Sequence, residues 1–189
     1  NFNDKHTLSA LLGFEYRQDT RDYSLMAGEG FPTFQFQTMQ SASTAVSVTG
    51  NWTGFKTAGL FAQANYDFDK KYYISGVLRY DGSSRFGANN RFGYFPGVSA
   101  AWAIDKESFL QDLTWITQLK LRASYGHTGN ANINNFAWRG LYQGLDPYNS
   151  APGIRPSGIS NPDLKWERNV TTNLGLDVAL FNGRISAQV

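Results

Sequence analysis

The chain has 189 residues and a net charge of +2, with acidic and basic residues interspersed, which argues against a nucleic-acid partner. It contains no cysteine, so a disulfide framework, a thiolate metal site and a cysteine nucleophile are excluded. The sequence has no apolar run of about eighteen residues, so it predicts no transmembrane helix. A spanning β-barrel is not excluded by this, because its strands are apolar only at alternate positions.

The first two strands are predicted from Thr7 to Asp19 and from Lys56 to Asp69, where apolar and polar side chains alternate with a period of two. Residues 20–55 show no lasting periodicity. They are predicted to form a long connection, in which Val46 and Val48 indicate one short strand.

The third and fourth strands are predicted as one regular hairpin, from Tyr72 to about Ile104, with a polar turn at Gly82–Arg91. A tight turn at Asp69 and Lys70 precedes it. One face of the hairpin is apolar and the other is small or polar. Leu78 and Trp102 belong to the first face, and Arg79 and Ser99 to the second.

The remaining strands follow two connections of different kinds. Residues 105–117 are predicted to hold a short helix capped by Asp105, because Phe109, Leu110, Leu113 and Ile116 fall on one helical face. The fifth strand is predicted from Leu119 to Gly126, and a second long connection runs to about Arg168. The sixth strand spans Val170 to Leu180, and a two-residue Asn182-Gly183 turn leads to the seventh.

Two patterns favour an all-β fold, an antiparallel transmembrane β-barrel wall segment of about seven strands, over a soluble β-sandwich. Long connections alternate with short turns along the chain, as in outer-membrane barrels with long external loops. The non-apolar face carries many charged groups, which a sandwich core would have to bury at several kcal/mol each but a watery lumen would solvate. These polar-face residues are Glu15, Arg17, Gln63, Asn65, Asp67, Arg79, Asp81, Lys120, Arg122, Asn173, Asp177 and Gln188.

Four segments resemble the SusC/RagA-like TonB-dependent transporters of Bacteroidetes outer membranes. They are RYDGSSRFGANNRFGYFPGVSAAW from Arg79, LKLRASYGHTGN (Leu119–Asn130), NPDLKWE (Asn161–Glu167) and LGLDVALFNGRISAQV (Leu174–Val189). The resemblance implies that residues 1–189 are part of a 22-stranded TonB-dependent receptor β-barrel domain. A plug, a TonB box and an N-terminal extension would then lie upstream, since the chain starts at Asn1 and ends within a strand pattern.

The resemblance also implies a function: active import of nutrient oligomers, glycans or peptides, across the cell outer membrane of a Gram-negative bacterium. The implied partners are a SusD-like surface lipoprotein, TonB acting through the missing N-terminal region, outer-membrane lipid, and an oligosaccharide or peptide cargo. It implies no cofactor. The alternative class is a passive porin or a structural and adhesive surface barrel, and a secreted β-sandwich lectin is a third interpretation.

Aromatic and cationic residues on or beside the long connections are the candidate substrate-binding residues, because sugar faces stack on rings and polar edges need hydrogen-bond donors. They are Trp52, Phe55, Trp138, Arg139, Tyr142 and Tyr148. Packing of the loops on each other or on a lid is an equally open interpretation.

The family motif has a structural interpretation: Pro162 would fix a turn and Trp166 would pack at the barrel rim. Its candidate residues are Asn161, Pro162, Leu164, Lys165, Trp166 and Glu167. The Gly82–Arg91 loop is interpreted as a polar hairpin tip rather than an anion site. The histidines, His6 and His127, have no partner at metal-ligand spacing, and no catalytic set is visible, so neither a metal site nor an enzyme is predicted.

Overall fold

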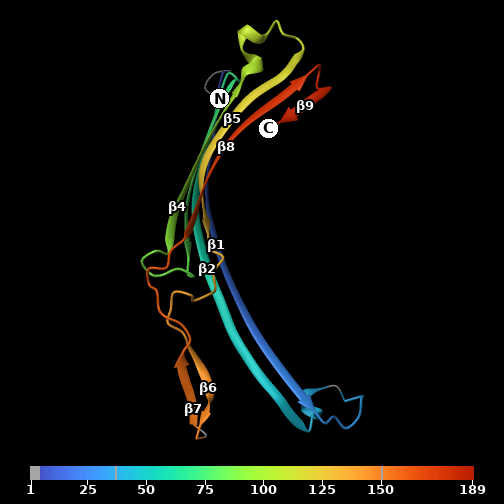
Figure 1. The fold of residues 1–189 in the computed structure, drawn as a ribbon, viewed down its shortest axis with the longest axis vertical. Coiled ribbons are helices and arrows are strands. Elements are labelled where there is room, and N and C mark those ends of the chain that lie inside the picture. Colours follow the sequence, from blue (N-terminus) through green and yellow to red (C-terminus); the bar gives the residue numbers. More distant parts are fainter. Residues whose placement is uncertain (1–4, 37, 150) are drawn as a thin grey trace.

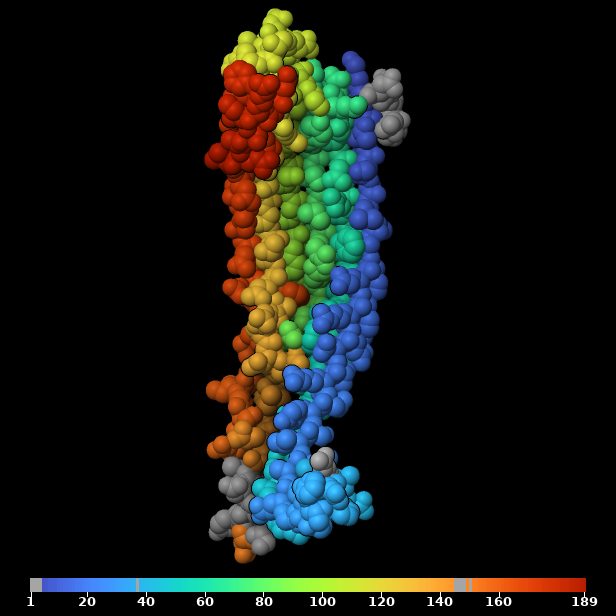
Figure 2. Space-filling model, turned by 90° about the vertical axis from the view of Figure 1, so that its right-hand side faces the viewer, coloured from blue at the N-terminus to red at the C-terminus, as the bar shows by residue number. Residues whose placement is uncertain are grey.

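The protein is one curved antiparallel sheet of seven strands, in the order β1-β2-β3-β4-β5-β8-β9, with a separate two-stranded sheet, β6-β7 (Figure 1). The computed structural model describes residues 5–36, 38–149 and 151–189, and of residues 145–148 it describes the backbone alone. The strands are β1 (His6–Glu29), β2 (Thr44–Phe68), β3 (Tyr72–Ser83), β4 (Phe92–Ala103), β5 (Ile116–Asn130), β6 (Tyr142–Tyr148), β7 (Ala151–Pro156), β8 (Glu167–Leu180) and β9 (Ile185–Gln188). Figure 2 shows the chain running across the sheet from its N-terminal strand along one edge to its C-terminal strands along the other.

The register confirms the two predicted faces. Leu78 pairs with Ala62 on β2 and with Pro96 on β4, so the apolar positions of adjacent strands lie in rows across the sheet. We call this side the apolar face. The opposite side, the polar face, carries Arg79 opposite Phe61 and Phe95. Both sets stay in phase because the registers from β2 to β5 are continuous, and those of β1 with β2 and of β5 with β8 shift only near a strand end, at Ala27/Gly28 and Ile116/Gln118. A slip of one residue within the sheet would exchange the faces.

The sheet has almost no core of its own. Among the described residues only three hydrophobic side chains are buried, those of Phe86, Phe95 and Ala103. On the apolar face Phe14 is 70% exposed and Leu174 is 79% exposed. A continuous apolar surface of this kind needs an apolar environment, since soluble proteins rarely expose one.

The long connections and the short turns lie at opposite ends of the sheet, as predicted. The loops 30–43, 84–91 and 131–166 share one end, which we call the long-loop end (Figure 1). The connections 69–71, 104–115 and 181–184 share the other, the turn end. Asp69 and Lys70 both have positive φ values, of 55° and 54°, as in the tight turns that join strands of right-handed twist.

The predicted connection over residues 20–55 is wrong for most of its length. β1 runs on to Glu29 and β2 begins at Thr44, so the two strands form a ribbon that projects beyond their neighbours (Figure 1). Val46 and Val48 belong to β2 itself. The alternation fades here because the ribbon no longer separates an apolar from a polar environment, whereas its backbone ladder continues regardless. The β6-β7 hairpin in the second long connection was likewise not predicted.

The predicted short helix over residues 105–117 is also wrong. The chain makes two three-residue 3-10 turns, Ile104–Lys106 and Ser108–Leu110, and Ile116 opens β5. Asp105 does not cap a helix; its carboxylate accepts a hydrogen bond from the Leu119 amide at 3.0 Å. A stretch this short cannot offset the unfavourable start of an α-helix. No helix of the described residues is long and apolar enough to cross a membrane.

The Asn182-Gly183 turn is longer than predicted. Leu180 pairs with Ile185, so the loop has the four residues 181–184. Phe181 leaves the ladder because its amide donates to the Trp115 carbonyl at 2.8 Å in the neighbouring connection.

Candidate functional site

The long-loop end is organised around the eight residues 84–91, which join β3 to β4. Ser84 fixes this loop to β2, because its amide donates to the Lys56 carbonyl at 2.9 Å and its hydroxyl accepts from the Lys56 amide at 2.9 Å. Phe86 is 1% exposed. The loop is therefore packed, and the predicted interpretation as a polar hairpin tip holds only for its exposed residues. The first two residues of the predicted loop, Gly82 and Ser83, belong to the end of β3.

Arg85 joins three segments that are far apart in sequence. Its guanidinium carbon lies 3.9 Å from the centroid of the Phe55 ring. The same group donates to the Asn135 side-chain oxygen at 2.7 Å and to the Ala131 carbonyl at 3.0 Å. Asn135 in turn donates to the Thr53 hydroxyl at 2.8 Å. These contacts engage the guanidinium group of Arg85 through one ring face and two hydrogen bonds. Arg85 therefore holds the ribbon to the start of the 131–166 connection instead of offering an anion site.

The NPDLKWE motif lies against the same loop. Asn89 and Asn90 donate to the side chain and carbonyl of Asp163 at 3.0 and 3.1 Å, and the Gly87 amide donates to the Leu164 carbonyl at 3.0 Å. A Cβ at Gly87 would collide with the Pro162 carbonyl oxygen, so only glycine fits this approach.

Trp166 of the motif fills the place where β4 and β5 separate. The two strands pair only from Gly97 opposite Gly126 onwards. Beyond that point Trp166 packs on Phe86 and Phe95, with ring centroids at 4.6 and 5.3 Å, and its indole nitrogen donates to the Arg91 carbonyl at 2.9 Å. The next residue, Glu167, accepts from Asn130 at 2.8 Å. These contacts favour the structural interpretation of the motif.

The structure brings four of the six predicted substrate-binding residues into contact with loop side chains. Trp52 stacks on Phe136 with ring centroids at 5.5 Å. Phe55 lies under Arg85. Trp138 donates to the Ser84 carbonyl at 3.2 Å, and its ring lies 5.0 Å from the guanidinium of Arg139. Loop packing thus occupies the ring faces of Phe55 and Trp138.

The other two predicted residues lie apart, on the β6-β7 hairpin. Tyr142 is 68% exposed. The side chain of Tyr148 lies outside the described residues. Together with Trp52, which is 59% exposed, Tyr142 keeps ring surface free for a ligand.

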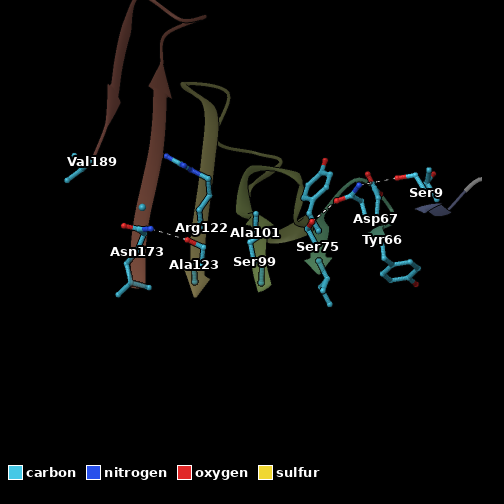
Figure 3. Close-up of a pocket in the computed structure, with 18 residues that line it drawn as sticks. Ser9, Tyr66, Asp67, Ser75, Ser99, Ala101, Arg122, Ala123, Asn173 and Val189 are labelled. Atoms are coloured by element: carbon cyan, nitrogen blue, oxygen red, sulfur yellow. Dashed lines mark hydrogen bonds between the residues drawn. The ribbon is translucent and has the colours of Figure 1, made fainter. Parts of the chain in front are cut away.

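The polar face contains a second candidate site that was not predicted as such. A groove of about 620 Å³ crosses six strands near the turn end (Figure 3). Its centre is a row of hydroxyl and amide side chains that pair from strand to strand: Ser9, Asn65, Ser75, Ser99, Ser124 and Asn173. Alternation predicted their face, but their alignment depends on register, which no single strand reveals.

The charged residues of the polar face are largely paired within the wall. Arg79 donates to Asp81 at 2.9 and 3.0 Å and lies 3.7 Å from Glu15. Arg122 donates to Asp177 at 2.6 Å. The described residues hold no group of three or more His, Asp or Glu side chains that could bind a metal ion.

A curved sheet with one lipid-compatible face, one polar face, and loops and turns segregated to opposite ends defines a segment of a membrane β-barrel wall. The family model described as "TonB dependent receptor-like, beta-barrel" matches residues 1–189. The chain therefore belongs to the TonB-dependent receptor β-barrel family.

Individual relatives agree with this assignment. The chain is 38% identical over 190 residues to TonB-dependent receptor P39 of Formosa agariphila, covering 100% of the chain and 18% of that protein. It is 39% identical over 137 residues to TonB-dependent receptor SusC of Bacteroides thetaiotaomicron, covering 68% of the chain and 14% of SusC. A solved structure of the RagAB peptide importer in its "closed-closed" state superposes with a TM-score of 0.92 at 34% identity, over 100% of this chain and 21% of that one. The chain thus spans between 14% and 21% of the length of these proteins, and the predicted SusC/RagA-like membership is confirmed.

Proposed function

We propose that this chain is part of the wall of an outer-membrane transporter that actively imports nutrient oligomers. The observation that carries the proposal is the in-phase alternation across seven strands, which gives a continuous exposed apolar face and a polar face with internally paired charges. The apolar face would contact outer-membrane lipid, and the polar face would line the interior.

The internal pairing of charges suits a wall past which polar cargo moves. An unpaired cation would hold carboxylates of the cargo, whereas the positive charge of Arg79 is balanced by the neighbouring carboxylates of Asp81 and Glu15. The neutral Ser and Asn row offers hydrogen bonds of moderate strength that are replaceable by water. Cargo contacts on this surface would be short-lived, as transport requires.

Cargo would be captured at the long-loop end, beneath a SusD-like surface lipoprotein, and TonB would act through the upstream region. RagAB is a peptide importer and SusC is a TonB-dependent receptor, so relatives of this kind support both import and a two-protein complex. The cargo would be an oligosaccharide or a peptide. Trp52 and Tyr142 are the residues proposed to contact it, while Phe55, Trp138 and Arg139 would shape the loops.

Growth of the host tests the proposal. A strain lacking the full-length gene would lose growth on one class of oligomer, glycan or peptide, as sole nutrient. Deletion of tonB would cause the same loss, because active import needs that energy input. Growth that depends on the receptor but persists without TonB would instead identify a passive porin, and unchanged growth on every oligomer tested would favour a structural or adhesive barrel.

A further inference from the structure

A second cleft, of about 500 Å³, lies at the long-loop end between the beginnings of β4 and β8. Its lining residues are Asn90, Phe92, Lys165, Trp166 and Arg168. Two of these are cations and none is an acid. Within the described part of the chain, the side chains of Lys165 and Arg168 have no hydrogen-bond or ion-pair partner, in contrast to Arg79, Arg85 and Arg122.

The register places two residues of this cleft, Arg168 and Phe92, on the apolar face. Arg168 pairs with Gly129, and the preceding residue, Glu167, pairs with Asn130. The side chains of Glu167 and Asn130 are hydrogen-bonded to each other on the polar face. Arg168 therefore shares its side of β8 with Val170 and Leu174. On β4, Phe92 stacks on Tyr80 with ring centroids at 5.1 Å, within the aromatic row that Tyr94 completes.

From the cleft towards the turn end, the exposed side chains of the apolar face change in type along the strands. The two cations come first, then Phe92 and Tyr94, which are 53% and 58% exposed. Aliphatic side chains follow, including Val170 at 55% and Leu174 at 79% exposed. Cations, then aromatic rings, then aliphatic side chains match the headgroup, interface and acyl chains of an anionic lipid, in that order.

We propose that this cleft binds the phosphate of an outer-leaflet lipid. Arg168 supplies a planar fork of donors suited to phosphate oxygens, and Lys165 adds a compact positive charge. Phe92 and Trp166 border the bound headgroup, and the acyl chains lie along Val170 and Leu174. The lipid would be held beside the seam that Trp166 fills, on the outside of the wall. This inference rests on the proposed membrane location and is independent of the cargo.

Lipid retention by the full-length receptor tests the inference. The purified protein would be placed in phosphatidylcholine nanodiscs with lipid A or with dephosphorylated lipid A, and bound glycolipid would be counted by native mass spectrometry. The wild type is expected to retain lipid A and not its dephosphorylated form. Replacing Lys165→Gln together with Arg168→Gln should lower the affinity about tenfold or more, because two charged hydrogen-bond donors are lost.

Matched variants separate recognition from misfolding. Lys165→Arg keeps the charge and should keep the lipid, and Arg184→Gln removes a cation at the turn end and should change nothing. Equal retention of lipid A by the double Gln variant and the wild type would overturn the proposal, as would equal retention of the dephosphorylated form. Inorganic phosphate that displaces lipid A at equimolar concentration would also overturn it, since the site would then recognise free phosphate as well as the lipid. A receptor that fails to enter nanodiscs at all would instead contradict the proposed function.

Discussion

The spanning part of the sheet and the long-loop end differ in how their stabilising contacts are distributed. In the spanning part each side chain meets residues on the next strand, as Leu78 meets Ala62 and Pro96. At the long-loop end one short loop binds residues some fifty to eighty positions away, for example Arg85 to Asn135 and Asn89 to Asp163. The spanning part therefore repeats the same kind of contact between paired residues of adjacent strands, whereas the long-loop end depends on a few individual side chains.

This difference predicts where single substitutions will have wide effects. In the spanning part the contacts are spread over many residue pairs, so a change of one side chain removes little stability. Contacts concentrated in the 84–91 loop are shared by the ribbon, the 131–166 connection and the motif, so one change there should loosen all three.

The largest effect is expected for Phe86→Ala. This ring is 1% exposed and packs on Trp166, so its loss should cost about 3 kcal/mol of local stability. Hydrogen exchange in the full-length receptor should show loss of protection throughout residues 131–166. Phe14→Ala, at a 70% exposed position of the apolar face, is the matched control and should leave those amides protected. Equal effects of the two variants would remove the distinction between the regions.

Gly87→Ala is expected to be second, at about 2 kcal/mol. The added methyl group would collide with the Pro162 carbonyl and displace the motif from the loop. Gly76→Ala adds the same methyl group within β3, where nothing lies within 4 Å of it, and should be neutral. Proteolysis of the 157–166 stretch in the intact receptor distinguishes them: faster cleavage is expected for Gly87→Ala alone.

Arg85→Lys should cost about 1 kcal/mol, because an ammonium keeps the charge but cannot bond Asn135 and Ala131 while lying flat on Phe55. Exchange should rise near residues 131–135 and 53–55. Arg21→Lys, on the same ribbon, is the control. A clamp that acts only through charge would survive Arg85→Lys, and unchanged exchange in that variant would contradict the geometry described above.

The smallest effect is expected at the turn end, in acid. Hydrogen bonds from Tyr72 and Trp102, with Lys71 nearby, lower the pKa of the Glu107 carboxyl below its usual value. A lowered pKa in the folded state contributes stability that is complete above the unfolded value of about 4.3 and is lost as the pH falls through the folded one. Trp102 fluorescence should therefore change reversibly below about pH 4. Glu107→Gln should abolish that change, and a transition that persists in this variant would assign it to another group.

The sequence was informative where the two faces meet different surroundings. Leu78 and Arg79 could be assigned to opposite faces because lipid and water impose a period of two. The prediction failed for residues 20–29 and 44–55, where both faces of the ribbon meet the same surroundings and only backbone pairing maintains the strands.

The contacts of the candidate site were less predictable for a different reason. Trp166 and Pro162 could be expected to pack because their residue types favour rims and turns. Nothing local indicates that Arg85 would reach Phe55 and Asn135, since that contact exists only after three segments have been brought together. The Ser and Asn row likewise appears only once the register is known.

The alternation of lipid and water along β3 is the most direct test of the barrel wall. Single cysteines at Ser75, Gly76, Val77, Leu78, Arg79 and Tyr80 of the full-length receptor, in outer-membrane lipid, would be spin-labelled and probed with oxygen and with a water-soluble nickel complex. Labels at 76, 78 and 80 should favour oxygen, and labels at 75, 77 and 79 should favour the nickel complex. Equal access of the nickel complex to both sets would contradict the assignment of the apolar face to lipid.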